Sequence, residues 1–437
     1  EPKDGGYYFS NWWKNQAKVV DGELKLVPAG YVDNDRIFDM EIVSSGCETA
    51  ANAAANADYA IVVLGNSPVV NAKEDFDRKD IILPPAQEEL IKAVYAANPN
   101  TIVVMTASYP FACNWAQENV PAILYSSHSG QELGSALASV IFGETSPSGR
   151  TSMTWYKDQT QLPNIQQYDI IKNNVTYMYL DSEVLYPFGH GLSYAEFKYS
   201  DLKLSLDKDI CTATVNVTNT SKIDAMEVVE LYVAKNGSKI KRARRQLKAF
   251  DKVMIPAGET VTVTLPVEID ELRIWDVRRS RYVLENGEYA FEICKNAYEV
   301  ILSQVVDLKG EEIANRVLSK GTILAMNCDD YDALVLDECS EGGVAVSQCK
   351  AGLSYDDCVF DGQTKLRIRC ANAKTTGTII VKADGEVIGE CKVAPTNGWQ
   401  IWEDSFCEIK PITGKKNVTF ECSYWGISIK EFEFLVK

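Results

Sequence analysis

The spacing of apolar residues changes along this chain, and this change constrains the fold more than any other feature. Between residues 44 and 145, apolar runs rich in β-branched residues, such as 59–65, alternate with helix-favouring stretches such as 85–97. This alternation is typical of a parallel sheet that helices cover on both faces. From residue 200 onward, apolar and polar residues instead alternate at a spacing of two, as in 212–217, which indicates strands of an antiparallel sandwich. The sequence therefore predicts an α/β part followed by an all-β part.

An acidic loop follows the first of these apolar runs. Residues 74–78 read Glu-Asp-Phe-Asp-Arg, so Glu74, Asp75, Asp77 and Arg78 stand close together. Loops that leave the carboxyl ends of parallel strands are common ligand sites, and carboxylates there can act as general acids or bases. Composition alone favours a simpler alternative, a solvated charged turn in which Asp77 and Arg78 pair and hold the loop.

Six motifs in this region make the chain resemble the C-terminal half of glycoside hydrolase family 3, the β-glucosidases and β-xylosidases. They stand in the same order as in the family, at residues 74–78, 83–87, 114–124, 130–134, 142–150 and 185–194. The resemblance implies an α/β sandwich domain with a parallel sheet. Its main body is expected at residues 44–199, preceded by an irregular or hairpin-forming part at residues 1–43.

The resemblance also implies the chemistry. Family members hydrolyse terminal non-reducing β-linked sugars with retention, using an Asp nucleophile and a Glu acid/base whose carboxyl groups lie roughly 5–5.5 Å apart. Glu74 matches the position of the acid/base, and Asp75 is a neighbour that could raise its pKa. His128 lies between a predicted strand and a predicted helix, as a site-lining residue or an ordinary structural histidine. The expected substrate is a β-linked oligosaccharide or an aryl glycoside, with glucose, xylose, arabinose and N-acetylglucosamine left open.

The nucleophile is not expected in this chain. In the family it lies in a (β/α)8 barrel that precedes the α/β sandwich, in a Ser-Asp context. The Ser-Asp dipeptide at residues 200–201 belongs instead to the predicted β-sandwich. The opening strand of the α/β domain is also expected to be missing, which would leave the sandwich incomplete. The chain is therefore expected to be a C-terminal portion that needs the barrel, as an N-terminal polypeptide or a second chain, for turnover.

Two further resemblances divide the all-β part. Residues 200–308 are similar to the fibronectin-III-like domain of the family, an immunoglobulin-like sandwich with a mainly structural role. Residues 320–437 look like a family 6 carbohydrate-binding module, a jelly-roll-like β-sandwich. The first resemblance rests on motifs at residues 215–220, 230–233, 256–260 and 287–289, and the second on motifs at residues 396–402 and 427–432.

The second of these modules suggests a further binding site. Such modules stack sugars on aromatic rings, and Trp399 and Trp402 are candidates for that role. Core packing accounts for the two tryptophans equally well. Ser428 stands where these modules often place a sugar-binding Asn, which is a departure from the pattern. A non-catalytic carbohydrate-binding protein is therefore the alternative to the enzyme.

Composition excludes several other functions. A chain of 437 residues has room for two to four domains, and its formal charge of −17 argues against nucleic acid or an anionic membrane as a partner. It holds no apolar run near the roughly 18–20 residues that span a bilayer. No cofactor is expected.

The cysteines leave two alternatives open. Eight of the twelve fall in the last quarter of the chain, which suits disulfides in a secreted module. Several lie in strand-like runs, however, and free buried thiols in a reducing cytosol or an anaerobe fit as well. With two histidines and no CxxC pair, a metal site is not expected. A bacterial, cytoplasmic location is preferred over secretion.

Overall fold

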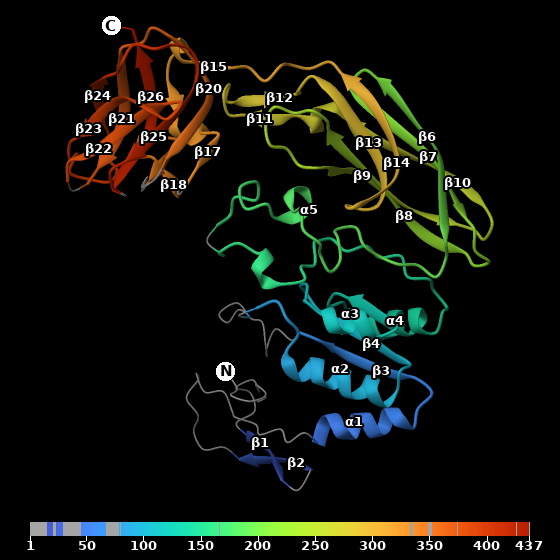
Figure 1. Ribbon diagram of the computed structural model, residues 1–437. Coiled ribbons are helices and arrows are strands. Elements are labelled where there is room, and N and C mark those ends of the chain that lie inside the picture. Colours follow the sequence, from blue (N-terminus) through green and yellow to red (C-terminus); the bar gives the residue numbers. More distant parts are fainter. Residues whose placement is uncertain are drawn as a thin grey trace. The chain divides into compact units, whose positions relative to one another are not determined.

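The chain divides into two units in the computed structural model. Unit 1 comprises Glu1–Ile269 and Glu288–Asp307, and unit 2 comprises Asp270–Gly287 and Leu308–Lys437. Figure 1 follows the chain through both. The structure describes residues 15–20, 23–28, 45–66, 78, 80–165, 167–332, 335–347, 352–373, 375–424 and 426–436.

The first part of unit 1 contains the predicted parallel sheet. Its described strands run in the order β3-β4-β5, and both neighbouring pairs are parallel. The strands are β3 (Ala60–Gly65), β4 (Thr101–Thr106) and β5 (Ala122–Ser126), and the helices between and around them are α1 (Ser45–Ala55), α2 (Pro85–Ala97), α3 (Asn114–Asn119) and α4 (Leu133–Ile141). The apolar run at residues 59–65 and the helix-favouring stretch at residues 85–97 appear as β3 and α2 with bounds that differ by at most one residue, and the parallel pairing of the strands confirms the α/β assignment.

Alternation along β3 accounts for how this sheet packs. Val62 and Leu64 are buried, and they share a core with Ile91 of α2 and Met105 of β4. The intervening residues of β3 face the other way, as in Val63, which is 65% exposed. This alternation is what a period of two predicts for a strand with one buried face. In β4, by contrast, Val103, Val104 and Met105 are all buried. The expectation that helices cover both faces of the sheet therefore fails at β3, among the residues that the structure describes. Because the three strands are parallel, their carboxyl ends lie at the same edge of the sheet.

Two smaller elements flank the sheet in the sequence. Strands β1 (Asn15–Val20) and β2 (Glu23–Pro28) form the antiparallel hairpin expected within residues 1–43. A short helix, α5 (Thr176–Tyr179), follows the connection after residue 159.

The second part of unit 1 is an antiparallel sandwich. Its two sheets have the orders β10-β7-β6 and β14-β13-β8-β9. The strands are β6 (Phe197–Asp207), β7 (Ile210–Asn219), β8 (Ala225–Lys235), β9 (Gln246–Ile255), β10 (Thr260–Glu268), β13 (Gly287–Asn296) and β14 (Glu299–Leu308). On β7, every second residue from Cys211 to Asn219 is buried, as the period of two requires.

A buried carboxylate pair joins the two parts of unit 1. Arg150 donates to Glu227 over 2.8 Å, and Tyr199 donates to the other oxygen of Glu227 over 2.7 Å. Glu230 accepts a hydrogen bond of 2.7 Å from Tyr232, and burial raises its pKa to about 7. The Ser-Gly-Arg motif that ends at Arg150 therefore contributes to the attachment of the sandwich.

Unit 2 is a second β-sandwich. Among the described residues, the strand orders of its two sheets are β15-β20-β25-β22-β23 and β18-β19-β26-β21-β24. In addition, β17 pairs with β20 in the first sheet and β16 pairs with β26 in the second. The strands are β15 (Arg316–Val317), β16 (Ile323–Leu324), β17 (Asp330–Tyr331), β18 (Val335–Glu338), β19 (Val344–Ser347), β20 (Leu353–Asp361), β21 (Lys365–Asn372), β22 (Gly377–Ala383), β23 (Glu386–Val393), β24 (Glu403–Glu408), β25 (Thr413–Cys422) and β26 (Ile427–Leu435). The all-β assignment for this part of the chain is confirmed.

A hairpin within the predicted fibronectin-like stretch folds with unit 2. It consists of β11 (Ile274–Asp276) and β12 (Arg281–Val283). Arg278, at its turn, donates to Asp357 over 3.0 Å and to the Ala314 carbonyl over 3.1 Å. Because Arg278 is nearly buried, these contacts tie the hairpin to the terminal sandwich.

Candidate functional site

The acidic motif at residues 74–78 belongs to the segment that connects Asn66 to Arg78, and this whole segment is called the acidic loop from here on. The residue that precedes it at the end of β3 is held in place. Gln87, near the start of α2, donates from Nε2 to the Gly65 carbonyl over 2.7 Å and accepts from the Gly65 N–H over 3.2 Å. A side chain at Gly65 would place its Cβ 1.8 Å from the Thr106 carbonyl oxygen, so only glycine fits this close approach of β3 to β4. The backbone that enters residues 67–77 is therefore held from two sides.

Arg78 fixes the other end of the same loop. Its Nη1 donates to the Pro110 carbonyl over 2.7 Å, and its guanidinium lies 3.9 Å from the centre of the Tyr109 ring. Pro110 and Tyr109 follow β4, so Arg78 lies at the carboxyl edge of the sheet. A cation over an aromatic face adds about 0.5–2 kcal/mol of attraction.

His128 links the ends of all three strands at this edge. Its Nε2 lies 2.9 Å from the Asn66 carbonyl, and its Nδ1 lies 2.7 Å from the Ser108 hydroxyl. Because a carbonyl can only accept, Nε2 carries a proton, and in the neutral ring the Ser108 hydroxyl donates to Nδ1. Asn66 also accepts from the Ser108 N–H over 2.9 Å. His128 therefore braces the residue from which the acidic loop leaves.

The structure brings together two of the predicted site residues. Both lie at the carboxyl edge of the sheet, where Arg78 donates to the Pro110 carbonyl and His128 donates to the Asn66 carbonyl. Glu74, Asp75 and Asp77 lie outside the described residues.

A cavity lies beside Arg78. It has a volume of about 430 Å³ and is largely apolar, with rings from Phe111, Tyr177 and Phe188 in its wall. The Thr154 hydroxyl, also in the wall, is buried and has no hydrogen-bond partner among the residues that the structure describes. The sequence did not predict this cavity. Its walls combine Arg78 and Phe188, which lie in two of the family motifs, with residues such as Phe111, Thr154 and Tyr177 from separate parts of the chain, and no local pattern shows that these segments meet.

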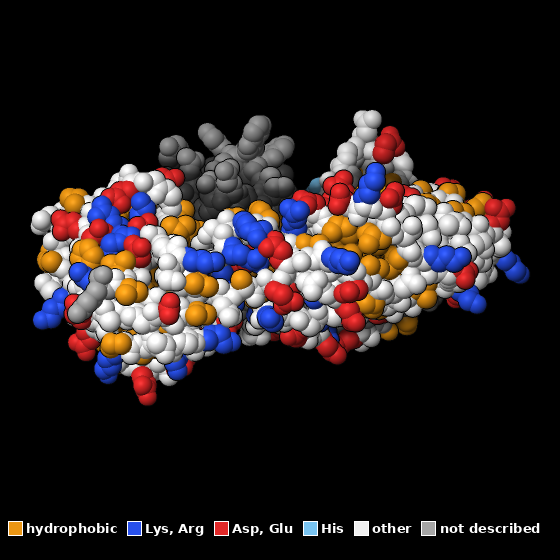
Figure 2. Space-filling view, turned by 90° about the horizontal axis from the view of Figure 1, so that it is seen from above, with side chains coloured by type: hydrophobic (Ala, Val, Ile, Leu, Met, Phe, Trp, Pro, Cys, Tyr) orange, Lys and Arg blue, Asp and Glu red, His pale blue; other side chains and the backbone are white. Residues whose placement is uncertain are grey.

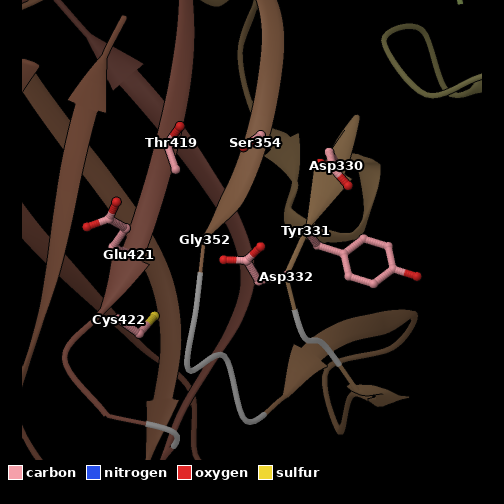
Figure 3. A pocket seen from close by; sticks show the side chains of 8 residues that line it. All are labelled: Asp330, Tyr331, Asp332, Gly352, Ser354, Thr419, Glu421 and Cys422. Carbon is pink, nitrogen blue, oxygen red and sulfur yellow. The ribbon is translucent and has the colours of Figure 1, made fainter. Parts of the chain in front are cut away.

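The terminal sandwich has a polar groove of its own (Figure 3). The groove has a volume of about 290 Å³, and its lining residues are Asp330, Tyr331, Asp332, Gly352, Ser354, Thr419, Glu421 and Cys422. Glu421 also pairs with Lys382 over 2.6 Å. In the view of Figure 3 the Tyr331 ring points away from the other labelled side chains. The groove thus offers carboxylates and hydroxyls, which suit the hydroxyl groups of a sugar.

The two candidate tryptophans have different surroundings. Trp402 is 6% exposed and packs in a buried cluster with Cys339 and Ala371, so its ring offers no face to a sugar. Trp399 is 41% exposed and keeps accessible ring surface. Ser428 is buried opposite Ala371 on the neighbouring strand. Of the two, Trp399 alone retains the accessibility that stacking needs.

The described residues offer little support for other classes of site. Within them, no group of three or more His, Cys, Asp or Glu side chains is placed to hold a metal ion. No helix in the described part has both the length and the apolar character needed to cross a membrane. The face of the molecule in Figure 2 intersperses basic with acidic side chains, unlike a basic patch that attracts nucleic acid.

Comparison with known families assigns each part of the chain. Residues 4–194 match the glycosyl hydrolase family 3 C-terminal domain, residues 227–297 the fibronectin type III-like domain, and residues 325–435 the carbohydrate binding module of family 6. The chain therefore carries a family 3 C-terminal domain, a fibronectin-like domain and a family 6 module, in the order expected.

Individual relatives agree with this assignment. The chain is 34% identical over 301 residues to a β-xylosidase of Formosa agariphila, covering 66% of this chain and 41% of the relative. It is 33% identical over 324 residues to thermostable β-glucosidase B of Acetivibrio thermocellus, covering 70% and 42%. The chain thus spans about two fifths of the length of these curated relatives.

Solved structures of similar fold are also β-glucosidases. The enzyme of Bifidobacterium adolescentis superposes with a TM-score of 0.58 at 32% identity, covering 64% of this chain and 42% of that one. The enzyme of Kluyveromyces marxianus in complex with glucose gives a TM-score of 0.57 at 28% identity, covering 65% and 35%.

Proposed function

We propose that this chain is the C-terminal portion of a retaining β-glycosidase, a β-glucosidase or β-xylosidase that releases terminal non-reducing β-linked sugars. Glu74 protonates the leaving glycosidic oxygen and later activates water, while an Asp on a (β/α)8 barrel attacks the anomeric carbon. The barrel is supplied by an N-terminal polypeptide or a second chain. The observation that carries the proposal is the family 3 domain at residues 4–194, whose acidic loop is held at both ends at the carboxyl edge of the sheet.

The residues around the loop have positioning roles in this proposal. Gln87 and His128 hold the backbone where the loop leaves the sheet, and Arg78 holds it where the loop returns. A general acid must lie within hydrogen-bond reach of the leaving oxygen, so fixed loop ends reduce the loss of entropy on reaching that geometry.

The cavity beside Arg78 supports an apolar leaving group. Rings and methionine side chains dominate its walls, and the Thr154 hydroxyl is available for one hydrogen bond. Its volume of about 430 Å³ is in the range of small-molecule sites. An aryl group attached to the sugar would bury its ring there.

Complementation tests the proposal. The 437-residue chain is purified, shown by mass spectrometry to be free of a second polypeptide, and assayed on aryl β-glucosides and aryl β-xylosides. We expect no turnover alone and turnover after addition of a barrel polypeptide from a family 3 relative. Robust hydrolysis by the chain alone would show that a carboxylate within it replaces the barrel nucleophile.

A non-catalytic carbohydrate-binding protein is the second candidate. It is favoured by the family 6 module and by the groove that contains Asp332 and Glu421. The discriminating observation is a mass spectrum of material purified from its natural source. A co-purifying barrel polypeptide supports the enzyme, whereas binding to xylan or β-glucan without such a polypeptide supports the second candidate.

A further inference from the structure

Two cysteines face each other where the edges of the two sheets of unit 2 meet. Strand β23 ends one sheet and β24 ends the other, and the two strands are in contact. They meet at an antiparallel bridge between Gly389 and Ile409, and the Lys410 N–H donates to the Ile388 carbonyl over 2.8 Å. Continued by two residues, this register places Cys391 directly opposite Cys407.

The close approach of these strands depends on Gly389. A Cβ at this position would lie 2.7 Å from Cγ2 of Ile409, so a larger residue would push the two edges apart. Residues opposite one another on antiparallel strands have Cα atoms about 4.5–5.5 Å apart. That distance falls within the range of about 4.4–6.8 Å that a disulfide spans.

The two side chains share one environment. Cys391 is fully buried in the core between the sheets, and Cys407 packs against the same core while remaining partly accessible. The two thiols interact directly: hydrogen bonding between them raises the pKa of Cys391 and lowers that of Cys407. Cys407 is therefore the thiol that ionises first and that a solvent-borne reagent can reach.

A third cysteine lies close by but is turned to other partners. The Sγ of Cys370, on β21, lies 3.4 Å from the Ser405 hydroxyl and 3.7 Å from the Glu403 carbonyl. It pairs across the strands with Glu403, not with Cys407. Cys370 is thus a suitable internal control.

We propose that Cys391 and Cys407 form a reversible disulfide that joins the edges of the two sheets of the terminal module. The oxidant is a low-molecular-weight disulfide such as glutathione disulfide. The Cys407 thiolate attacks one sulfur of glutathione disulfide, forming a mixed disulfide and releasing one glutathione. The Cys391 sulfur then attacks the Cys407 sulfur, and the Cys391 proton passes to the departing glutathione sulfur, so the second glutathione leaves as a thiol. Two protein thiols are oxidised, and one glutathione disulfide is reduced to two thiols.

The test uses the intact, folded chain. It is incubated with glutathione disulfide or with reduced glutathione, free thiols are alkylated with iodoacetamide, and peptides are analysed by mass spectrometry without reduction. Oxidation should join the peptides of Cys391 and Cys407 and protect both from alkylation, while Cys370 remains alkylated after denaturation. The unfolding midpoint of the module should rise by on the order of 10 °C on oxidation, because the bond closes a loop of about 15 residues.

Two variants that each lack one cysteine show which thiols form the bond. Cys407→Ala should abolish the cross-link and the rise in the midpoint, whereas Cys370→Ala should retain both. Free, alkylated Cys391 and Cys407 in the oxidised wild-type chain would overturn the proposal, as would a bond between Cys391 and Cys370. The wild-type result is decisive even if a variant folds poorly.

Discussion

Gln87 forms two hydrogen bonds with the backbone of one residue, Gly65. These bonds take the place of those that a neighbouring strand would form with the N–H and carbonyl of Gly65 on the side away from β4. The Gln87 amide donates to the Gly65 carbonyl over 2.7 Å and its oxygen accepts from the Gly65 N–H over 3.2 Å. Residue 67, where the acidic loop begins, follows two positions later. The position of this loop relative to the sheet therefore depends on a side chain from α2.

Replacing Gln87 should loosen the loop. Gln87→Ala leaves two partly buried backbone groups without partners, so we expect the free energy of unfolding to fall by about 1–3 kcal/mol. In the barrel-completed enzyme kcat should fall more than the affinity for substrate. Urea unfolding and steady-state kinetics measure the two effects. Gln131→Ala, at an exposed position, is the control. An equal loss of stability and of kcat in both variants would contradict the role of Gln87 in holding Gly65.

The buried Glu230 predicts a pH dependence of stability in unit 1. Burial raises its pKa from 4.5 to about 7, so between these values the folded chain holds a proton that the unfolded chain has released. This contribution to stability is fully present below pH 4.5 and is lost as the pH rises through about 7. The loss amounts to about 3 kcal/mol.

Chemical unfolding at several pH values tests this. Glu230→Gln, which stays neutral and can still accept from Tyr232, should flatten the dependence between pH 4.5 and 7. Glu196→Gln, at an exposed position, should leave it unchanged. An unaltered profile in Glu230→Gln would assign the pH dependence to other groups.

The two tryptophans of the terminal module should respond differently to truncation. Trp402→Ala removes a buried ring, so we expect a loss of about 3–5 kcal/mol in stability. Trp399→Ala removes an exposed ring and should change stability by less than about 0.5 kcal/mol while weakening retention on gels containing xylan or β-glucan. Unchanged retention in Trp399→Ala would leave the groove around Asp332 and Glu421 as the remaining candidate.

The sequence predicts the elements better than their long-range contacts. Strands β3 to β5 and their helices follow from hydrophobic spacing and from Pro85 at the start of α2, which are local signals. The hairpin at residues 274–283 reads as part of the fibronectin-like stretch, yet Arg278 ties it to Asp357, far away in the sequence. No local pattern encodes such a pair.

The same distinction applies to the candidate sites. The motif at residues 74–78 identifies the loop, but the partners of Arg78 at Pro110 and Tyr109 come from another strand end. Trp399 and Trp402 are equivalent by composition, and only the packing of Trp402 against Cys339 and Ala371 separates them. The cavity beside Arg78 is built from segments far apart in the sequence, including α5 and residues 110–112, and hydrophobic spacing does not show that they meet.

The leaving-group dependence of Glu74→Gln in the barrel-completed enzyme decides whether Glu74 is the acid/base. A variant without the general acid should lose roughly 10²–10⁴-fold in kcat/KM on natural oligosaccharides, whose leaving groups need a proton. It should lose much less on 2,4-dinitrophenyl glycosides, whose leaving group departs as a stable phenolate. Glu89→Gln, on the surface of α2, is the matched control and should retain full activity on both. Equal losses on the two substrate types, or no loss on either, would contradict the assignment of Glu74.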